Sequence, residues 1–316
     1  MLMMVLGSAP MAAAWTCVYV SSYHKGYAWS DGIERGLRAE LNGHCDLIQF
    51  DMDTKRNRSE LYKTQKAVDL ARKIKAIKPE VIIASDDNAA RYLIAPYFSG
   101  GDIPVVFCGI NWTVKEYGFP ASNVTGMVEV TAFRPMLDWA SKLTRPGARG
   151  VYIGTDALSE LKDYMFLSKV AAEMGLTIDR IIVDDQQAWM SALEQSNEAD
   201  FIILGTSSGI NGWDEKTLLP FVREHVDKLI LTSYRQMMPF AMIGFVKIPE
   251  EQGEWAAKTA IAIHEGVPIQ RIPIIANRKW EVYENTSLLK LADIEISEAL
   301  HARAKKFSQG TSDDSR

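Results

Sequence analysis

Residues 81–112 read VIIASDDNAARYLIAPYFSGGDIPVVFCGINW, and this stretch decides the fold class. It contains two short apolar runs, VIIAS and IPVVFCG, and turn residues bound both of them. The segment between the runs has a helical period and predicts a short helix from Asn88 to Phe98. A strand, a helix and a second strand in this order indicate a parallel sheet with a crossover helix.

The same alternation continues through both halves of the chain. In the first half it predicts helices and strands at 16–22, 31–41, 46–52, 59–78 and 124–130. In the second half it predicts them at 132–143, 150–155, 159–174, 178–184, near Trp189, 201–207, 215–226, 228–233, 241–246 and from Pro249 to Gly266. Two such series in tandem predict an α/β protein made of two doubly wound, parallel-sheet lobes.

Composition narrows the class of protein. The chain has 316 residues, of which 47% are hydrophobic and 24% charged, with a formal net charge of -5. This length suits two lobes of about 100–150 residues each. Because no segment is strongly basic, we expect no nucleic-acid partner.

The two ends of the chain differ from the rest. Residues 1–14, MLMMVLGSAPMAAA, are apolar and uncharged and end in small residues, which predicts a secretion signal cleaved at Ala12-Ala13-Ala14 and a periplasmic protein. The alternative is a buried N-terminal helix. The segment is too short to span a bilayer, which takes about 20 residues. Residues 308–316, SQGTSDDSR, predict a disordered tail.

The cysteines and histidines provide few candidates for a functional site. Cys17 and Cys45 each lie near the start of a predicted strand, so either they form one disulfide or all three cysteines, with Cys108, are buried thiols. The five histidines never fall at the H-x-x-x-H spacing. We therefore expect no metal site and no cofactor.

Ligands of open parallel sheets bind beyond the carboxyl ends of the strands, so the residues that follow each strand are candidates. Tyr23, Tyr27 and Trp29 follow the first strand, and we expect at least one of these rings to contact a ligand. In the alternative, the rings pack on their own lobe and Ser30 or Asp31 caps the next helix.

Polar residues follow the third strand, where Ser85-Asp86-Asp87-Asn88 opens the predicted helix. We expect one of them to cap that helix and a spare carboxylate to receive an ammonium or hydroxyl group of a ligand. Paired carboxylates are also typical of acid–base catalysis, in which Asp86 or Asp87 would be the base. The sequence offers no complementary nucleophile, and it contains neither G-x-S-x-G nor H-E-x-x-H. We therefore favour binding over catalysis.

Two further strand-end loops each contain a tryptophan. Asn111 and Trp112 follow the fourth strand, and the loop 206–213, TSSGINGW, follows FIILG. Small hydrogen-bond donors beside an indole ring are suited to the wall of a ligand-binding site. Nucleotide binding is weakly supported because the chain lacks GxxxxGK[ST].

Three stretches resemble a known family. IASDDNAARYL, then IPVVFCGIN with NVTGMVE, then EEQGEWAAKTAIAIHEG with IPIIANRKWEVYEN are similar to substrate-binding proteins of ABC transporters with the type I periplasmic fold. The chain looks closest to the branch that includes tryptophan- and tyrosine-binding lipoproteins. The Asp86-Asp87 pair departs from that branch, and no lipobox cysteine follows the leader.

The resemblance implies a hinge between the lobes, with the ligand held in the cleft and no catalysis. Lobe 1 would comprise 15–127 and 241–277, and lobe 2 would comprise 128–240 and 278–307. The implied ligand-binding residues, joined with the aromatic candidates, are Tyr23, Trp29, Ser85, Asp86, Asn88, Asn111, Trp112, Glu129, Thr155, Asp156, Thr206, Ser207 and Trp213.

Two functions without catalysis follow from this resemblance. In the first, a monomeric periplasmic protein captures a small polar or aromatic, amino-acid-like molecule and delivers it to an ABC permease. In the second, a similar module presents its ligand-bound form to a membrane sensor. An enzyme that uses Asp86 or Asp87 is the third alternative.

Overall fold

The computed structural model describes residues 15–308. The predicted signal segment 1–14 and most of the predicted tail, 309–316, lie outside the described residues. None of the helices between Trp15 and Ser308 combines the length and the apolar character needed to cross a membrane.

The first lobe is built on a six-stranded sheet in the order β11-β5-β4-β3-β1-β2, and every neighbouring pair is parallel. Its strands are β1 (Trp15–Ser21), β2 (Cys45–Asp51), β3 (Val81–Ser85), β4 (Val105–Asn111), β5 (Val124–Glu129) and β11 (Ile275–Ala276). Its helices are α1 (Ala28–Leu41), α2 (Glu60–Ile77), α3 (Asp86–Asn88), α4 (Ala95–Tyr97) and α9 (Pro249–His264), with a π-helical turn η1 (Ala89–Ile94) and 3-10 turns η2 (Lys115–Tyr117) and η5 (Ile269–Arg271). The helix predicted at 88–98 is thus three short pieces that begin at Asp86.

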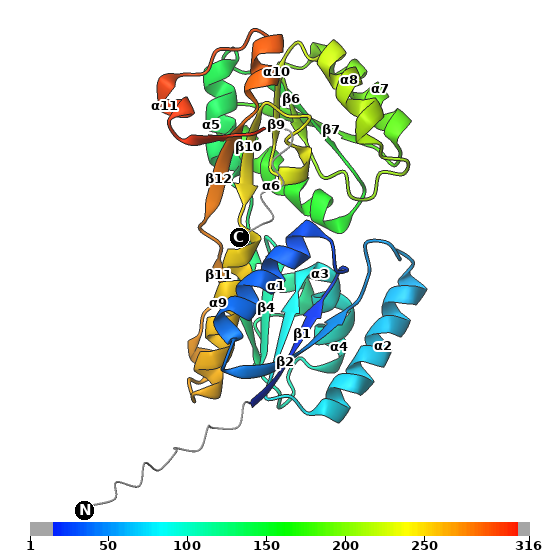
Figure 1. Ribbon diagram of the computed structural model, residues 1–316, viewed down its shortest axis with the longest axis vertical. Helices are drawn as coiled ribbons and strands as arrows, with labels where there is room; N and C mark the ends of the chain where they lie inside the picture. Colours follow the sequence, from blue (N-terminus) through cyan, green and yellow to red (C-terminus); the bar gives the residue numbers. More distant parts are fainter. Residues whose placement is uncertain (1–14, 309–316) are drawn as a thin grey trace, which may run out of the picture.

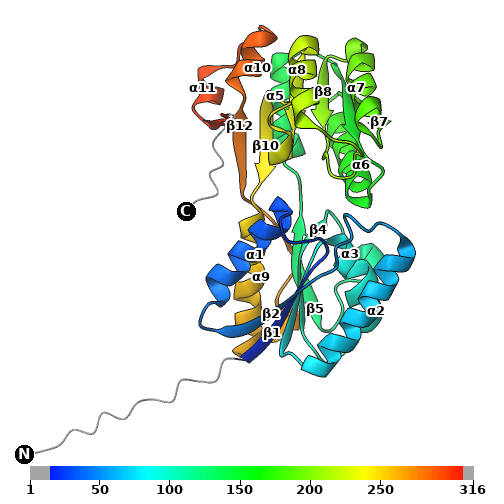
Figure 2. The same cartoon turned by 45° about the vertical axis from the view of Figure 1, so that its right-hand side comes forward.

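Helices cover both faces of this sheet. Figure 1 shows α1 with α9 on one side and α2 with α4 on the other, and Figure 2 shows α1 and α9 again on the side opposite α2. Side chains of a strand alternate between faces, so Cys17 and Tyr19 pack with α1 and α9, whereas Val18 and Val20 pack with α2. Both faces are therefore apolar, as a doubly wound sheet requires.

The second lobe is built on a seven-stranded sheet in the order β13-β12-β10-β9-β8-β6-β7. Its strands are β6 (Arg149–Gly154), β7 (Thr177–Ile182), β8 (Phe201–Leu204), β9 (Leu229–Thr232), β10 (Ile243–Lys247), β12 (Trp280–Glu284) and β13 (Ala304–Lys306). Its helices are α5 (Phe133–Leu143), α6 (Leu158–Glu173), α7 (Gln186–Gln195), α8 (Glu215–His225), α10 (Thr286–Leu291) and α11 (Glu298–His301), with 3-10 turns η3 (Ser196–Glu198) and η4 (Arg235–Met237). The pair β10–β12 is antiparallel and the other pairs are parallel. The predicted α/β class with two mostly parallel sheets is confirmed.

One boundary between the lobes differs from the prediction. Residues 241–277 were expected in lobe 1, but β10 pairs with β9 and β12 in the second sheet. The second crossing therefore follows Lys247 rather than Phe240. The chain also stays in the first sheet up to Glu129, two residues beyond the predicted limit at 127.

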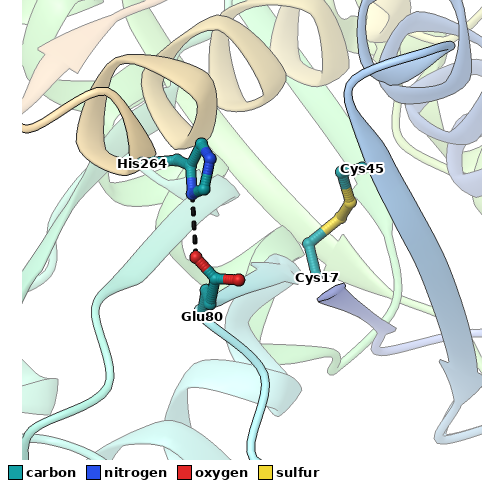
Figure 3. Close-up of a disulfide and its surroundings, with 4 residues drawn as sticks. All are labelled: Cys17, Cys45, Glu80 and His264. Carbon is teal, nitrogen blue, oxygen red and sulfur yellow. Dashed lines mark hydrogen bonds and ion pairs between the residues drawn. A yellow bond between two sulfur atoms is a disulfide. The ribbon is translucent and has the colours of Figure 1, made fainter. Parts of the chain in front are cut away.

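A disulfide joins the first two strands. Cys17 of β1 and Cys45 of β2 are bonded (Figure 3), with their Cα atoms 6.0 Å apart. Cys108 is free and buried. Of the two alternatives, the single bridge is therefore the one found. Closing a loop of 28 residues stabilises the fold by about 3–4 kcal/mol through the entropy of the unfolded chain. Nearby, His264 hydrogen-bonds Glu80, as Figure 3 shows.

Candidate ligand-binding cleft

The two sheets share one strand order, so corresponding loops lie at the carboxyl edge of each sheet. β2-β1-β3-β4-β5 and β7-β6-β8-β9-β10 both follow the doubly wound order, in which the order of strands along the sheet reverses between the first and third strands of each series. Such a reversal opens a crevice at the carboxyl ends of the strands, where ligands of this fold class bind.

A cavity of about 350 Å³ lies between these two edges. It is lined by Tyr23, Thr54, Lys55, Arg58, Glu60, Lys63, Asp87, Asn88, Arg91, Tyr92, Asp156, Ala157, Leu158, Ser159 and Ser208. Residues that follow β1, β2 and β3 form its first-lobe wall, and residues that follow β6 and β8 form its second-lobe wall. The lobes therefore enclose it jointly.

Aromatic rings and one lysine form the inner corner of the first-lobe wall. Tyr23 is buried and meets Tyr27 edge-on, with ring centroids 5.2 Å apart. The Lys55 ammonium lies over both rings, 4.5 Å from the Tyr23 centroid and 5.4 Å from the Tyr27 centroid. Cation–π contacts of this kind hold an ammonium without a carboxylate.

The loop after β3 is organised differently from the prediction. None of Ser85 to Asn88 caps the helix with its side chain; instead the Ala89 amide donates to Ser22 Oγ, 2.7 Å away. The Asn88 side chain instead donates to Thr54 Oγ1, 2.8 Å away. The capping prediction is therefore wrong.

Asp86 is a buried carboxylate in a strained position. It is 2% exposed and has a φ of 71°, a left-handed conformation that favours glycine. Trp29 Nε1 donates to Asp86 Oδ1 at 2.9 Å, whereas the buried Oδ2 atom has no hydrogen-bond partner among residues 15–308. Burial raises the pKa of Asp86 well above its ordinary value, and the nearby Glu129 carboxylate raises it further.

Asp87 connects the two lobes. Its Oδ1 atom accepts hydrogen bonds from Lys162 Nζ of α6 at 2.6 Å and from the Tyr117 hydroxyl at 2.7 Å. Its Oδ2 atom accepts from Asn111 Nδ2 at 2.8 Å. Lys162 also pairs with Glu116 of the first lobe. Oδ1 thus links the two lobes through Lys162, whereas Oδ2 is held within the first lobe by Asn111. Both oxygens already accept hydrogen bonds, which disfavours the proton abstraction considered above.

Trp112 reaches from the first lobe into the second. Its ring stacks on Phe166 and Phe133, with centroids 4.2 Å and 5.5 Å apart. Its Nε1 atom donates to Asp163 Oδ1 at 2.7 Å. Trp112 is thus an interlobe contact, and it does not line the cavity.

A second buried ion pair lies at the crossings between the lobes. Lys247, at the end of β10, pairs with Glu129, at the end of β5, and its Nζ donates to Thr131 Oγ1 at 3.0 Å. Burial raises the pKa of Glu129 even though Lys247 opposes the shift. Burial alone would lower the pKa of Lys247, but Glu129 and Asp163 together raise it.

Other predicted residues lie around the cavity rather than in its lining. Thr206 Oγ1 accepts from the Ser208 amide and so shapes the loop that does line it, while the Thr155 carbonyl accepts from Arg180. Trp213 packs edge-on against Trp189 and Phe240 in the second-lobe core. A further set, Trp29, Ser85, Asp86, Asn111, Glu129 and Ser207, is likewise outside the lining.

Three of the predicted residues, Tyr23, Asn88 and Asp156, line the cavity. Sequence reasoning missed its basic side chains, including Lys55 and Arg58 in the loop after β2. A signal was present, because three basic residues fall within 55–58 at the carboxyl end of a strand. Among residues 15–308, no group of three or more His, Cys, Asp and Glu side chains could hold a metal ion.

Comparisons with known proteins agree with this architecture. Residues 18–308 match the family described as ABC transporter substrate binding protein, whereas no curated protein sequence matches the chain. Solved structures share the fold at low identity. An ABC domain in complex with L-Trp from Streptococcus pneumonia has a TM-score of 0.69 and 15% identity, covering 92% of this chain and 99% of that one.

Two further structures have the same fold. A ligand-free, open substrate binding protein with adhesive properties from Clostridium difficile has a TM-score of 0.69 and 13% identity, covering 92% of this chain and 99% of that one. A periplasmic ribose ABC transporter protein from Conexibacter woesei has a TM-score of 0.61 and 13% identity, covering 93% and 99%. The expected type I periplasmic binding fold is confirmed.

Proposed function

Because the chain belongs to the family of ABC transporter substrate-binding proteins, we propose that it captures a small polar or aromatic, amino-acid-like molecule between its lobes. It then delivers this molecule, chemically unaltered, to an ABC transporter from the periplasm. One observation carries the proposal: the 350 Å³ cavity is lined from both lobes by the loops at the two facing sheet edges. A ligand that contacts both walls favours the closed arrangement over an open one.

The test is a thermal-shift screen of the purified protein against a library of neutral, cationic and anionic metabolites. A true ligand at about 100 times its Kd adds about 2.7 kcal/mol to the free energy of unfolding. Small-angle X-ray scattering should then show a smaller radius of gyration, and mass spectrometry should recover the compound unchanged. A library in which nothing binds would refute capture, and a converted compound would indicate an enzyme.

A variant pair checks that the cavity is the binding site. Tyr23→Ala should weaken the affinity about tenfold or more, because a ring in the cavity wall loses its contact area. Tyr97→Ala, in the first lobe but outside the lining, is the matched control. In cells, loss of the protein should abolish uptake of the ligand; loss of a transcriptional response with uptake intact would favour the sensing role.

A further inference from the structure

The cavity lining carries more positive charge than its own carboxylates neutralise. It contains four basic residues, Lys55, Arg58, Lys63 and Arg91, and three acidic residues, Glu60, Asp87 and Asp156. Glu60 is occupied by Lys63 and by the Tyr92 hydroxyl, and Asp87 by Lys162.

Three cations of the first lobe therefore lack a carboxylate partner. Within residues 15–308, no carboxylate oxygen lies within 4.0 Å of the side-chain nitrogens of Lys55, Arg58 or Arg91. Lys55 is half-buried and fixed over the rings of Tyr23 and Tyr27. The two rings hold this ammonium by cation–π contacts, and because no carboxylate of residues 15–308 pairs with it, an anion that enters the cavity can do so.

The facing wall of the second lobe offers hydrogen-bond donors. Helix α6, of 16 residues, begins at Leu158, and Ala157 at its N-cap provides no side-chain acceptor for the first turn. Leu158 and Ser159 of that turn line the cavity, so the positive end of the helix dipole, with first-turn amides that have no intrahelical acceptor, lies beside it. These donors and the first-lobe cations are independent features that favour an anion, and the three cations Lys55, Arg58 and Arg91 outnumber Asp156, the lining carboxylate beside this turn.

The junction between the walls is tight at Arg58. A Cβ atom added to Gly209 would lie only 1.9 Å from Arg58 Nη2, so the guanidinium touches the backbone of the second-lobe loop. The Ser208 hydroxyl of that loop lies 3.4 Å from the Tyr27 hydroxyl. An anion held here would contact both lobes at once.

We propose that the captured molecule carries an anionic group, a carboxylate or a phosphate monoester, bound between Lys55 and Arg58 of the first lobe and the first turn of α6. This inference rests on the proposed function and specifies the chemical class of its ligand. Because the anion meets cations on one lobe and helix amides on the other, its charge drives closure of the lobes.

Matched pairs of compounds that differ in charge alone test the inference. We would titrate the protein with 4-hydroxyphenylacetate and its primary amide, succinate and succinamide, and glycerol 3-phosphate and glycerol. At least one anion should raise Tm at about 10 mM or below while its uncharged partner does not. Its affinity should fall as sodium chloride rises from about 50 to about 500 mM. Response to the carboxylates, or to the phosphate ester, identifies which group the site takes.

Side-chain variants locate the effect. Arg58→Gln and Lys55→Gln should each weaken binding of the anion by about 10–100-fold, since each removes a charged hydrogen bond worth about 1.5–3 kcal/mol. Arg56→Gln is the matched control, because Arg56 lies in the same loop, pairs with Asp53 and does not line the cavity. Arg58 is exposed, so its replacement leaves the fold intact.

Three results would overturn the inference: an amide or alcohol that binds as tightly as its anionic partner, variants that bind like the wild type, or no binding by any anion. If a neutral or cationic metabolite from the broad screen nevertheless closes the lobes, the proposed function stands and the charge assignment fails. If no compound of either set binds, both fail.

Discussion

At the scale of single residues, Glu160 shows how burial sets a charge. The side chain is 0% exposed and accepts hydrogen bonds from Tyr234 at 2.9 Å and Tyr152 at 3.0 Å. Burial first, and then the charge of Asp163, raises the pKa of Glu160 to about 6 despite these hydrogen bonds. Because the folded value exceeds the unfolded value of about 4.3, the folded protein binds more protons between the two, and the stability from this group falls as pH rises through that window.

Glu160→Gln should remove this pH dependence. The free energy of unfolding of the variant, minus that of the wild type, should become more positive by about 1 kcal/mol between about pH 5 and about pH 7.5. Urea unfolding at the two pH values measures it. Glu173→Gln, at the exposed end of the same helix, is the control and should give the same difference at both. An unchanged difference for Glu160→Gln would show that the carboxyl is ionised throughout.

At the scale of elements, the sequence predicted well where helices begin, because local residues determine it. Helix α2 begins after Ser59, whose side chain accepts from the Tyr62 amide, and α9 begins at Pro249, as the sequence indicates. The sheet to which β10 belongs was not predictable, because an apolar run does not specify its neighbours. Lys55 and Arg58 were missed because a charged loop is usually solvated, and the opposing lobe makes this one part of a cavity.

The packing of α1 on α9 gives a prediction at this scale. The helices touch through glycines: a Cβ on Gly253 would lie 2.1 Å from the Ile33 carbonyl oxygen, and one on Gly36 would lie 2.3 Å from the Glu250 carbonyl oxygen. Both obstacles are backbone, so neither can rotate aside. Gly253→Ala and Gly36→Ala should each lower the free energy of unfolding by about 1–3 kcal/mol through overpacking, measured by urea unfolding.

Gly101→Ala supplies the control for these variants, since Gly101 is an exposed loop residue with its nearest obstacle at 3.2 Å. If the Gly253→Ala variant were as stable as the wild type, α1 and α9 would be able to move apart without lowering the free energy of unfolding. Because α9 follows the second crossing and α1 follows the aromatic loop 23–27, this contact also fixes the cleft wall to the crossing.

At the scale of the whole molecule, the lobes are held closed by one side chain that extends from each lobe into the other. Lys162 extends from the second lobe to Asp87, and Trp112 extends from the first lobe to Phe166 and Asp163. A third link, Lys247 with Glu129, lies at the crossings themselves. A ligand in the cavity contacts both lobes, so ligand binding and these links favour the same closed arrangement.

Trp112→Ala should therefore open the molecule. Truncating a packed tryptophan removes about 3–5 kcal/mol of contact, enough to shift an open–closed equilibrium by more than 100-fold. The radius of gyration of the ligand-free variant, from small-angle X-ray scattering, should rise, and a bound ligand should reverse the rise. Trp213→Ala is the control: its ring packs within one lobe, so the variant should lose stability without expanding. A Trp112→Ala variant as compact as the wild type would show that closure depends on the crossing segments rather than on this contact.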